Sequence, residues 1–151
     1  MISEVSNAQV LHWVERGYSY LDVRSEAEFE AGHVPGAYNI PLSFGTRSGL
    51  VPNPDFLEVV RAGFGVERPL LLGCHSGGRA RRAAEQLRSA GFRTLAVHRE
   101  GWGGCRDAFG RLTPGWNQGG FPRSTASQEG RDYASLARAG QNPQGASRIS
   151  S

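Results

Sequence analysis

The chain has 151 residues, of which 38% are hydrophobic, and its formal net charge at pH 7 is +3. This length and apolar content predict one domain with a hydrophobic core of ordinary size. All 17 basic residues are arginine, which excludes the lysine of a nucleotide-binding phosphate loop and the lysine of a Schiff base. No apolar run approaches the roughly 20 residues that span a bilayer, so we expect a soluble protein that makes no membrane contact.

Helical and extended patterns alternate from the N-terminus onward. Apolar residues at helical spacing predict a first helix over residues 6–16. Strands are predicted at residues 18–23 and 37–40, and Ser25 can cap a short helix between them. The first strand therefore ends close to two charged residues, Asp22 and Arg24, at the sheet edge where open α/β proteins place their sites.

The middle of the chain continues this alternation. Residues 42–53 hold glycine, serine and proline with little periodicity, and they predict a long loop whose only charge is Arg47. The further elements predicted are helices over 55–62, 79–90 and 101–109 and strands over 70–72 and 93–98. This order predicts an α/β fold in which helices cover both faces of a mostly parallel sheet.

The composition changes at Pro114. Beyond Phe121 the large apolar side chains are Tyr133, Leu136 and Ile149, which are too few to offset the entropy cost of ordering the chain. We therefore predict a folded domain over residues 6–113 and a disordered tail over residues 114–151.

Cys74 lies where the strand 70–72 gives way to the helix 79–90. At such a junction, backbone N–H groups converge and the helix dipole adds positive charge. Both effects favour an ionised thiol, so we expect Cys74 to be largely thiolate at neutral pH. Gly77 and Gly78 allow the positive φ angles that a tight loop needs. The loop is therefore predicted to be an anion site that carries a nucleophile.

The spacing within this loop separates two chemistries. Four residues stand between Cys74 and Arg79, whereas the C-x5-R pattern of protein phosphatases would place an arginine at position 80, which is Ala80. The shorter loop forms a tighter ring. A tighter ring suits one added sulfur atom better than a tetrahedral phosphate.

Two segments together resemble the rhodanese family of single-domain sulfurtransferases. One is the loop GCHSGGR at 73–79, and the other is YLDVRSEAEFEAGHVPGAYNIP at 20–41. Residues 49–56 and 89–92 look most like the plant and algal senescence-associated branch of that family. The resemblance covers about residues 6–109 and implies a rhodanese-like fold.

The resemblance also implies a mechanism that needs no cofactor. Cys74 would attack the outer sulfur of thiosulfate or a similar donor, and the resulting persulfide would pass its sulfur to cyanide or to a thiol such as glutathione or thioredoxin. Backbone N–H groups of the loop would stabilise the persulfide, and Arg79 would hold the loop and attract the donor. Asp22 and Arg24 would support the loop, and Arg47 is a candidate for steering the donor. The loop residues concerned are His75, Ser76, Gly77, Gly78 and Arg79.

Two other functions are compatible with a thiol in such a loop. The first is a rhodanese-like binding or regulatory module, which the complete loop with Cys74 and Arg79 disfavours. The second is a thiolate phosphatase or arsenate reductase, which the loop length disfavours. A serine hydrolase centred on Ser76 is excluded, because Cys74 stands where its G-x-S-x-G motif needs glycine.

The remaining chemistry-bearing residues leave few further sites. Cys105 is either an inert buried residue or a resolving thiol for Cys74, and the sequence does not decide between them. The four histidines lack metal-ligand spacing, so we expect no metal. The arginines that follow Gly78 have no interleaved aromatic residues, so we expect no nucleic-acid partner. Two cysteines fit a reducing compartment, and we expect a monomer in a plastid, a mitochondrion or the cytoplasm.

Overall fold

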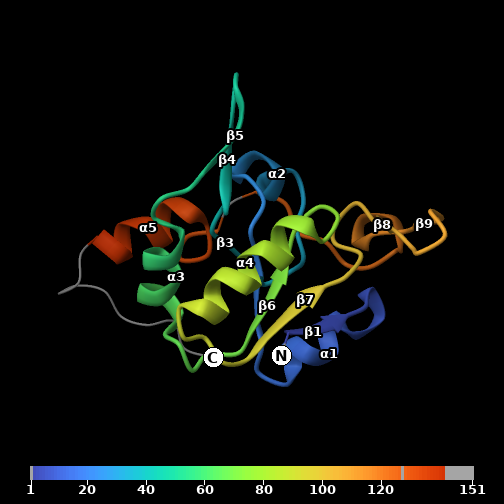
Figure 1. The fold of residues 1–151 in the computed structure, drawn as a ribbon, viewed down its shortest axis with the longest axis horizontal. Helices are drawn as coiled ribbons and strands as arrows, with labels where there is room; N and C mark the ends of the chain where they lie inside the picture. Colours follow the sequence, from blue (N-terminus) through green and yellow to red (C-terminus); the bar gives the residue numbers. More distant parts are fainter. Residues whose placement is uncertain (1, 127, 142–151) are drawn as a thin grey trace.

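Five parallel strands form the central sheet in the computed structural model, which describes residues 2–126 and 128–141 (Figure 1). Their order across the sheet is β1-β7-β6-β2-β3, and every neighbouring pair is parallel. The strands are β1 (Ile2–Val5), β2 (Ser19–Asp22), β3 (Tyr38–Asn39), β6 (Leu70–Gly73) and β7 (Leu95–His98). The strand that precedes Cys74 is therefore the central one, with a neighbour on each side.

Helices cover both faces of this sheet, as the alternation of strands and helices predicts. α3 (Phe56–Phe64), α4 (Gly78–Ser89) and α5 (Tyr133–Gln141) pack on one face, and Figure 1 shows α3 and α5 side by side. The other face carries α1 (Val10–Glu15), α2 (Glu26–Ala31) and the 3-10 helix η2 (Trp116–Gln118). A second 3-10 helix, η1 (Asn7–Gln9), leads into α1. The predicted α/β fold is confirmed.

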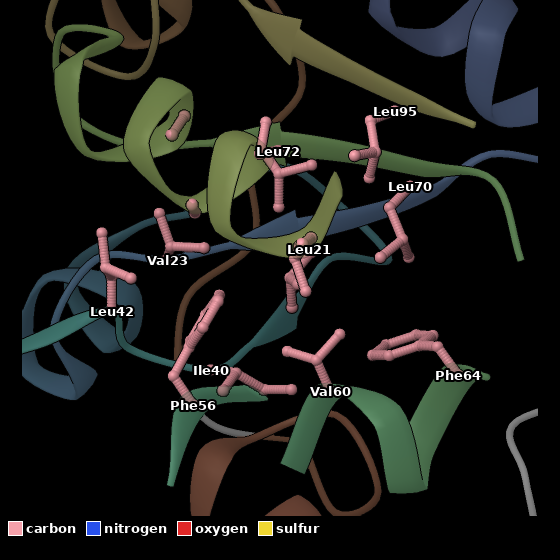
Figure 2. Close-up of a cluster of buried hydrophobic side chains, with 14 of the residues drawn as sticks. Leu21, Val23, Ile40, Leu42, Phe56, Val60, Phe64, Leu70, Leu72 and Leu95 are labelled. Carbon is pink, nitrogen blue, oxygen red and sulfur yellow. The ribbon is translucent and has the colours of Figure 1, made fainter. Parts of the chain in front are cut away.

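The larger core lies between the sheet and α3, as Figure 2 shows. Leu21, Leu70 and Leu72 point from the strands towards Val60 and Phe64 of α3. Leu71 lies in the separate core on the opposite face, because successive strand residues point to opposite sides of a sheet. Burial of each such side chain contributes about 1.5–3 kcal/mol. This packing fixes β6 and hence the position of the loop that follows it.

Several local predictions agree with the structure. The helix predicted over 79–90 is α4, and the short helix capped by Ser25 is α2, where Ser25 and Glu28 form a reciprocal capping box. α3 begins and ends later than predicted, because Asp55 is its N-cap and Gly65 ends it. No helix within residues 2–126 and 128–141 has the length and apolar character of a membrane span.

The long loop predicted over 42–53 is wrong. These residues form a hairpin of β4 (Ser43–Thr46) and β5 (Gly49–Pro52) that projects from the body of the molecule (Figure 1). Its turn is closed by a hydrogen bond from Thr46 Oγ1 to Gly49 O at 2.7 Å, and Gly49 has a φ of +108° that glycine adopts without strain. The ring of Phe44 lies 6.2 Å from that of Tyr133, and all four residues of β5 are exposed, so the hairpin lacks the alternation of buried and exposed residues that would predict a strand.

The helix predicted over 101–109 is also wrong. Gly101 and Gly104 have φ angles of +69° and +98°, which break a helix, and the chain forms a second hairpin from β8 (Cys105–Arg106) and β9 (Leu112–Thr113). Strand β1 has no counterpart among the predicted elements, because its four residues carry only two large apolar side chains.

The prediction of a disordered tail from residue 114 onward is wrong for the part of the tail that the structure describes. Trp116 is fully buried, and its indole Nε1 donates to Pro122 O at 2.7 Å. Leu136 of α5 is 5% exposed and packs in the core beside α3. Residues 127 and 142–151 lie outside the described residues. A few large side chains therefore suffice to hold this segment, because the domain offers a ready surface for them.

The packed tail predicts that Leu136→Ala destabilises the protein. Removing a buried leucine side chain costs about 2–3 kcal/mol of unfolding free energy, through lost burial and the cavity left behind. Chemical unfolding measures the change, with Arg138→Ala as the control on an exposed position of the same helix. Equal unfolding free energies for both variants would contradict the packing of α5.

Candidate active site

Cys74 is held at the bottom of a loop that curls around its sulfur. The residue is 2% exposed, and its Sγ accepts N–H groups from Gly77 at 3.0 Å and Ala80 at 3.3 Å. Gly77 has a φ of +98°, whereas Gly78 does not adopt a positive φ. A β-carbon on Gly77 would come within 2.9 Å of Arg99 O. The loop therefore depends on glycine at position 77 but not at position 78.

The segment after β7 holds the same loop from outside. Trp102 N donates to Cys74 O and Gly103 N to His75 O, each at 2.8 Å. A β-carbon on Gly101 would lie 2.6 Å from Cys74 O, so only glycine permits this approach. The glycine cluster at 101–104 was the sequence signal for this contact, although it was interpreted as part of a helix.

Arg79 is clamped by an acid from a distant part of the chain. Its Nη1 and Nη2 donate to Oε1 and Oε2 of Glu28 at 2.9 and 3.1 Å. Burial raises the pKa of Glu28, but the hydrogen bonds from Arg79 and Ser25 and the charge of Arg79 lower it more, to about 2. The pair ties the start of α4 to α2. Glu28 was not identified from the sequence as the partner of Arg79.

This ion pair predicts that stability depends on acid pH. The pKa of Glu28 is about 2 when folded and 4.5 ordinarily, so its contribution is complete above about pH 4.5 and is lost as the pH falls towards 2. Because 35% of the Glu28 side chain is exposed, solvent screening reduces the contribution to about 1 kcal/mol. Urea unfolding of the parent and of Glu28→Gln at several pH values measures it. The difference in unfolding free energy between the parent and the variant should shrink on acidification. A difference that does not change with pH would refute the contribution of the Glu28–Arg79 ion pair.

Asp22 and Arg24 form a buried ion pair beside the same loop. Arg24 Nε donates to Asp22 Oδ1 at 3.0 Å, and its Nη2 donates to Asp22 Oδ2 at 2.8 Å and to Gly32 O at 2.7 Å. Burial lowers the pKa of the Arg24 guanidinium, but the Asp22 carboxylate raises it more. The guanidinium also lies 5.0 Å from the ring centroid of Trp102. These contacts connect the end of β2 with the segment that holds Cys74.

A chain of polar groups, of which Tyr20 and His98 are buried, runs beneath the end of β6. The Tyr20 hydroxyl lies 2.7 Å from His98 Nδ1, and His98 Nε2 lies 2.6 Å from Asn7 Oδ1. Asn7 donates through Nδ2 to Pro114 O, so its Oδ1 accepts from His98 and the hydroxyl of Tyr20 donates to Nδ1. Burial lowers the pKa of His98 to about 4, against the opposing charge of Glu100. The imidazole is therefore neutral at pH 7, and sequence reasoning did not identify this network.

Arg47 is the candidate site residue that the structure does not connect to the loop. It is exposed in the turn between β4 and β5, and that hairpin projects from the body of the molecule (Figure 1). It has no ion pair among the residues that the structure describes. Its proposed steering role therefore has no contact to support it.

Cys105 lies in a neighbouring cleft of about 700 Å³ that is lined by residues 76–78 of the loop, by α4 and by the β8–β9 hairpin. Its sulfur is unpaired, and burial, followed by the charge of Glu100, raises the pKa of its thiol. Cys74 is not among the residues that line this cleft. A resolving role for Cys105 stays a prediction. Within the described parts of the chain, no three potential metal ligands lie together.

The fold and this loop define a class: α/β proteins with a cysteine cradled by backbone amides at the end of a central parallel strand. The model of the rhodanese-like domain family matches residues 6–108, and the chain belongs to that family. The family resemblance of the two sequence segments is thus confirmed.

Named relatives refine the comparison. Over 106 residues the chain is 40% identical to "Thiosulfate sulfurtransferase 16, chloroplastic" of Arabidopsis thaliana, covering 70% of this chain and 79% of the relative. It is 41% identical over 78 residues to "Senescence-associated protein DIN1" of Raphanus sativus, covering 52% of this chain and 43% of that relative. The crystal structure of Rv0390 from M. tuberculosis has a TM-score of 0.66 at 25% identity, covering 82% of this chain and 98% of that one.

Proposed function

We propose that the protein is a sulfurtransferase that carries a sulfane sulfur on Cys74. The observation that supports this most directly is the Cys74 Sγ, which accepts two backbone N–H groups in a loop closed by glycine. Donors placed in this way stabilise negative charge on sulfur without having to reorganise during the reaction. The name of the Arabidopsis relative supports thiosulfate as the donor.

The proposed reaction has two displacements. In the first, the Cys74 thiolate attacks the outer sulfur of thiosulfate, a Cys74–sulfur bond forms, the sulfur–sulfur bond of thiosulfate breaks, and sulfite leaves with the electron pair. In the second, cyanide or a thiolate attacks the outer sulfur of the persulfide, and Cys74 leaves as thiolate. Two steps through a covalent intermediate predict ping-pong kinetics.

The residues around the loop receive positioning roles in this proposal. Arg79 is engaged by Glu28 through both of its terminal nitrogens, so its main contribution is to hold the loop rather than to bind the donor. The Asp22–Arg24 pair and Trp102 position the loop from the other side. The word "chloroplastic" in the relative's name supports a plastid as the compartment.

Mass spectrometry of the intact protein tests the proposal. Thiosulfate treatment should add the mass of one sulfur atom, cyanide should remove it, and peptide mapping should place it on Cys74. Cys105→Ser is the matched control and should still gain the sulfur. A protein that gains no sulfur would support the alternative of a binding module. An adduct on Cys105 would show that Cys74 is not the nucleophile.

A further inference from the structure

Two hairpins stand on either side of the Cys74 loop. In the strand order, β2 and β3 lie on one side of β6, whereas β7 and β1 lie on its other side. β4–β5 follows β3 and β8–β9 follows β7, so the hairpins extend from opposite sides of β6, the strand that precedes Cys74. Figure 1 shows them projecting from the molecule, with the N-terminal end of α4 between them.

The hairpins carry most of the exposed large apolar side chains of the described residues. Leu50 and Val51 on β5 are 62% and 45% exposed, and Phe109 and Leu112 in β8–β9 are 82% and 62% exposed. The remaining one is Leu11 on α1, at 39%. Neighbouring exposed apolar side chains, such as those that each hairpin carries, are typical of protein contact sites.

Arginines without acidic partners accompany these apolar side chains. Arg47 lies in the turn of β4–β5, Arg106 lies on β8, and Arg82 lies on α4; none of the three has an ion pair within residues 2–126 and 128–141. Arg82 and Arg106 both line the cleft of about 700 Å³ between α4 and β8–β9. This side of the molecule therefore offers positive charge to a partner.

The acids of the cleft do not cancel this charge. Glu4 and Asp107 are occupied by ion pairs with Arg81 and Arg111. Glu85 is the cleft acid that has no ion pair in the described part of the chain. In the cleft, two arginines without ion pairs, Arg82 and Arg106, thus stand against one such carboxylate, so an acidic surface complements this region.

We propose that the two hairpins and the cleft dock an acidic protein that presents the acceptor thiol to Cys74. We define the hairpin surface by the residues Arg47, Leu50, Val51, Arg82, Arg106, Phe109 and Leu112. The proposal rests on the proposed sulfur transfer and names the class of its acceptor. Cyanide has neither the apolar side chains nor the carboxylates that such a surface binds, whereas a polypeptide can carry both. A second copy of this chain is disfavoured as the occupant, because it would bring like charge to a basic surface.

The transfer step on this surface is balanced without any added oxidant or reductant. The acceptor thiol loses its proton to solvent, its thiolate attacks the outer sulfur of the Cys74 persulfide, and a sulfur–sulfur bond forms on the acceptor. The bond between Cys74 and that sulfur breaks, and Cys74 keeps the electron pair. Since Cys74 is 2% exposed, the acceptor must bring its thiol on a projecting segment.

Two short synthetic peptides test the proposal. Each has one central cysteine; one is flanked by leucine and glutamate, and the other by leucine and lysine. The protein charged with thiosulfate should transfer sulfur to the acidic peptide with a kcat/KM at least about tenfold higher, and the preference should shrink as salt screens the charges. Fluorescence anisotropy with Cys74→Ser measures binding of the same peptides independently of sulfur transfer.

Variants locate the docking surface. Arg106→Glu should remove the preference for the acidic peptide, and Phe109→Ser should weaken binding of both peptides, while thiosulfate-to-cyanide turnover stays within about twofold. The matched controls are Arg16→Glu and Leu11→Ser on the first helical segment, which should change neither the preference for the acidic peptide nor the binding of the two peptides. Equal use of the two peptides, or a preference that survives Arg106→Glu, overturns the proposal. A dimer in sedimentation that Phe109→Ser dissociates also overturns it in favour of a second copy.

These outcomes separate the docking proposal from the proposed function. If thiosulfate leaves no sulfur on Cys74, the sulfurtransferase proposal fails, and the acceptor role fails with it. Selective binding of the acidic peptide to Cys74→Ser would then still establish the docking surface. If sulfur transfer to cyanide proceeds but neither peptide binds selectively, only the docking proposal fails.

Discussion

Cys74→Ser should abolish thiosulfate-to-cyanide sulfur transfer, with turnover falling at least about a thousandfold, because a serine hydroxyl cannot form the persulfide that links the two displacements. The fold should survive. Oxygen is smaller than sulfur and can accept the N–H groups of Gly77 and Ala80 that now point at Sγ. The measurement is thiocyanate formation, combined with thermal unfolding to show that the variant is folded.

Cys105→Ser is the control for this result. Cys105 is only half-buried, its pKa is raised mainly by burial, and it lines the neighbouring cleft. Its replacement should leave turnover within about twofold of the parent, because a protonated thiol is a poor nucleophile. Substantial turnover in Cys74→Ser, or loss of turnover in Cys105→Ser, would show that the nucleophile has been assigned to the wrong cysteine.

The parts of the site that could be predicted from the sequence depend on neighbouring residues. Three leucines followed by glycine, cysteine and a helical pattern indicate a buried strand, a tight loop and α4, and all three are present. The capping box of Ser25 and Glu28 is likewise formed within one helical turn. Such features follow from local geometry, so their signal is contained in a few consecutive residues.

The missed parts depend on contacts between distant segments. Arg79 and Glu28 are 51 positions apart, and the capping box that marks Glu28 locally carries no sign of its ion pair with Arg79. Trp116 and Leu136 stand in polar, glycine-rich surroundings, yet the core buries them. Mean composition predicts disorder there, because it cannot register that one or two large side chains have a prepared surface to pack against.

Short strands were missed for a related reason. β1 carries only two large apolar side chains and β8 has only two residues, so neither shows an apolar pattern of its own, and each forms because a partner strand offers backbone hydrogen bonds. The glycines within residues 101–104 are a further feature that periodicity does not reveal. Their φ angles and their approach to the backbone of Cys74 and His75 decide the structure there, whereas a periodicity argument counts them only as weak helix formers.

Gly77→Ala should cause the second large loss of activity. Alanine at a φ of +98° is strained by about 1–2 kcal/mol, and its β-carbon would come within 2.9 Å of Arg99 O, a backbone atom that cannot rotate away. The loop must shift, and the N–H of residue 77 then leaves its position 3.0 Å from Cys74 Sγ. Displacements of about 1 Å at a reacting centre cost up to about a hundredfold in rate, so kcat/KM should fall by about tenfold to a hundredfold.

Gly78→Ala provides a control one residue away with the same change in volume. Gly78 begins α4 without a positive φ, and its added β-carbon would have only Arg82 Nη1 nearby, at 3.8 Å on a flexible side chain. Alanine also favours a helix over glycine by about 1 kcal/mol, so this variant should be at least as stable as the parent and should keep kcat/KM within about twofold. Equal losses in both variants would mean that the loop is sensitive to any added bulk. A loss confined to Gly77→Ala would instead attribute the activity to the amide that points at the sulfur, because this amide is the group that the strained position displaces.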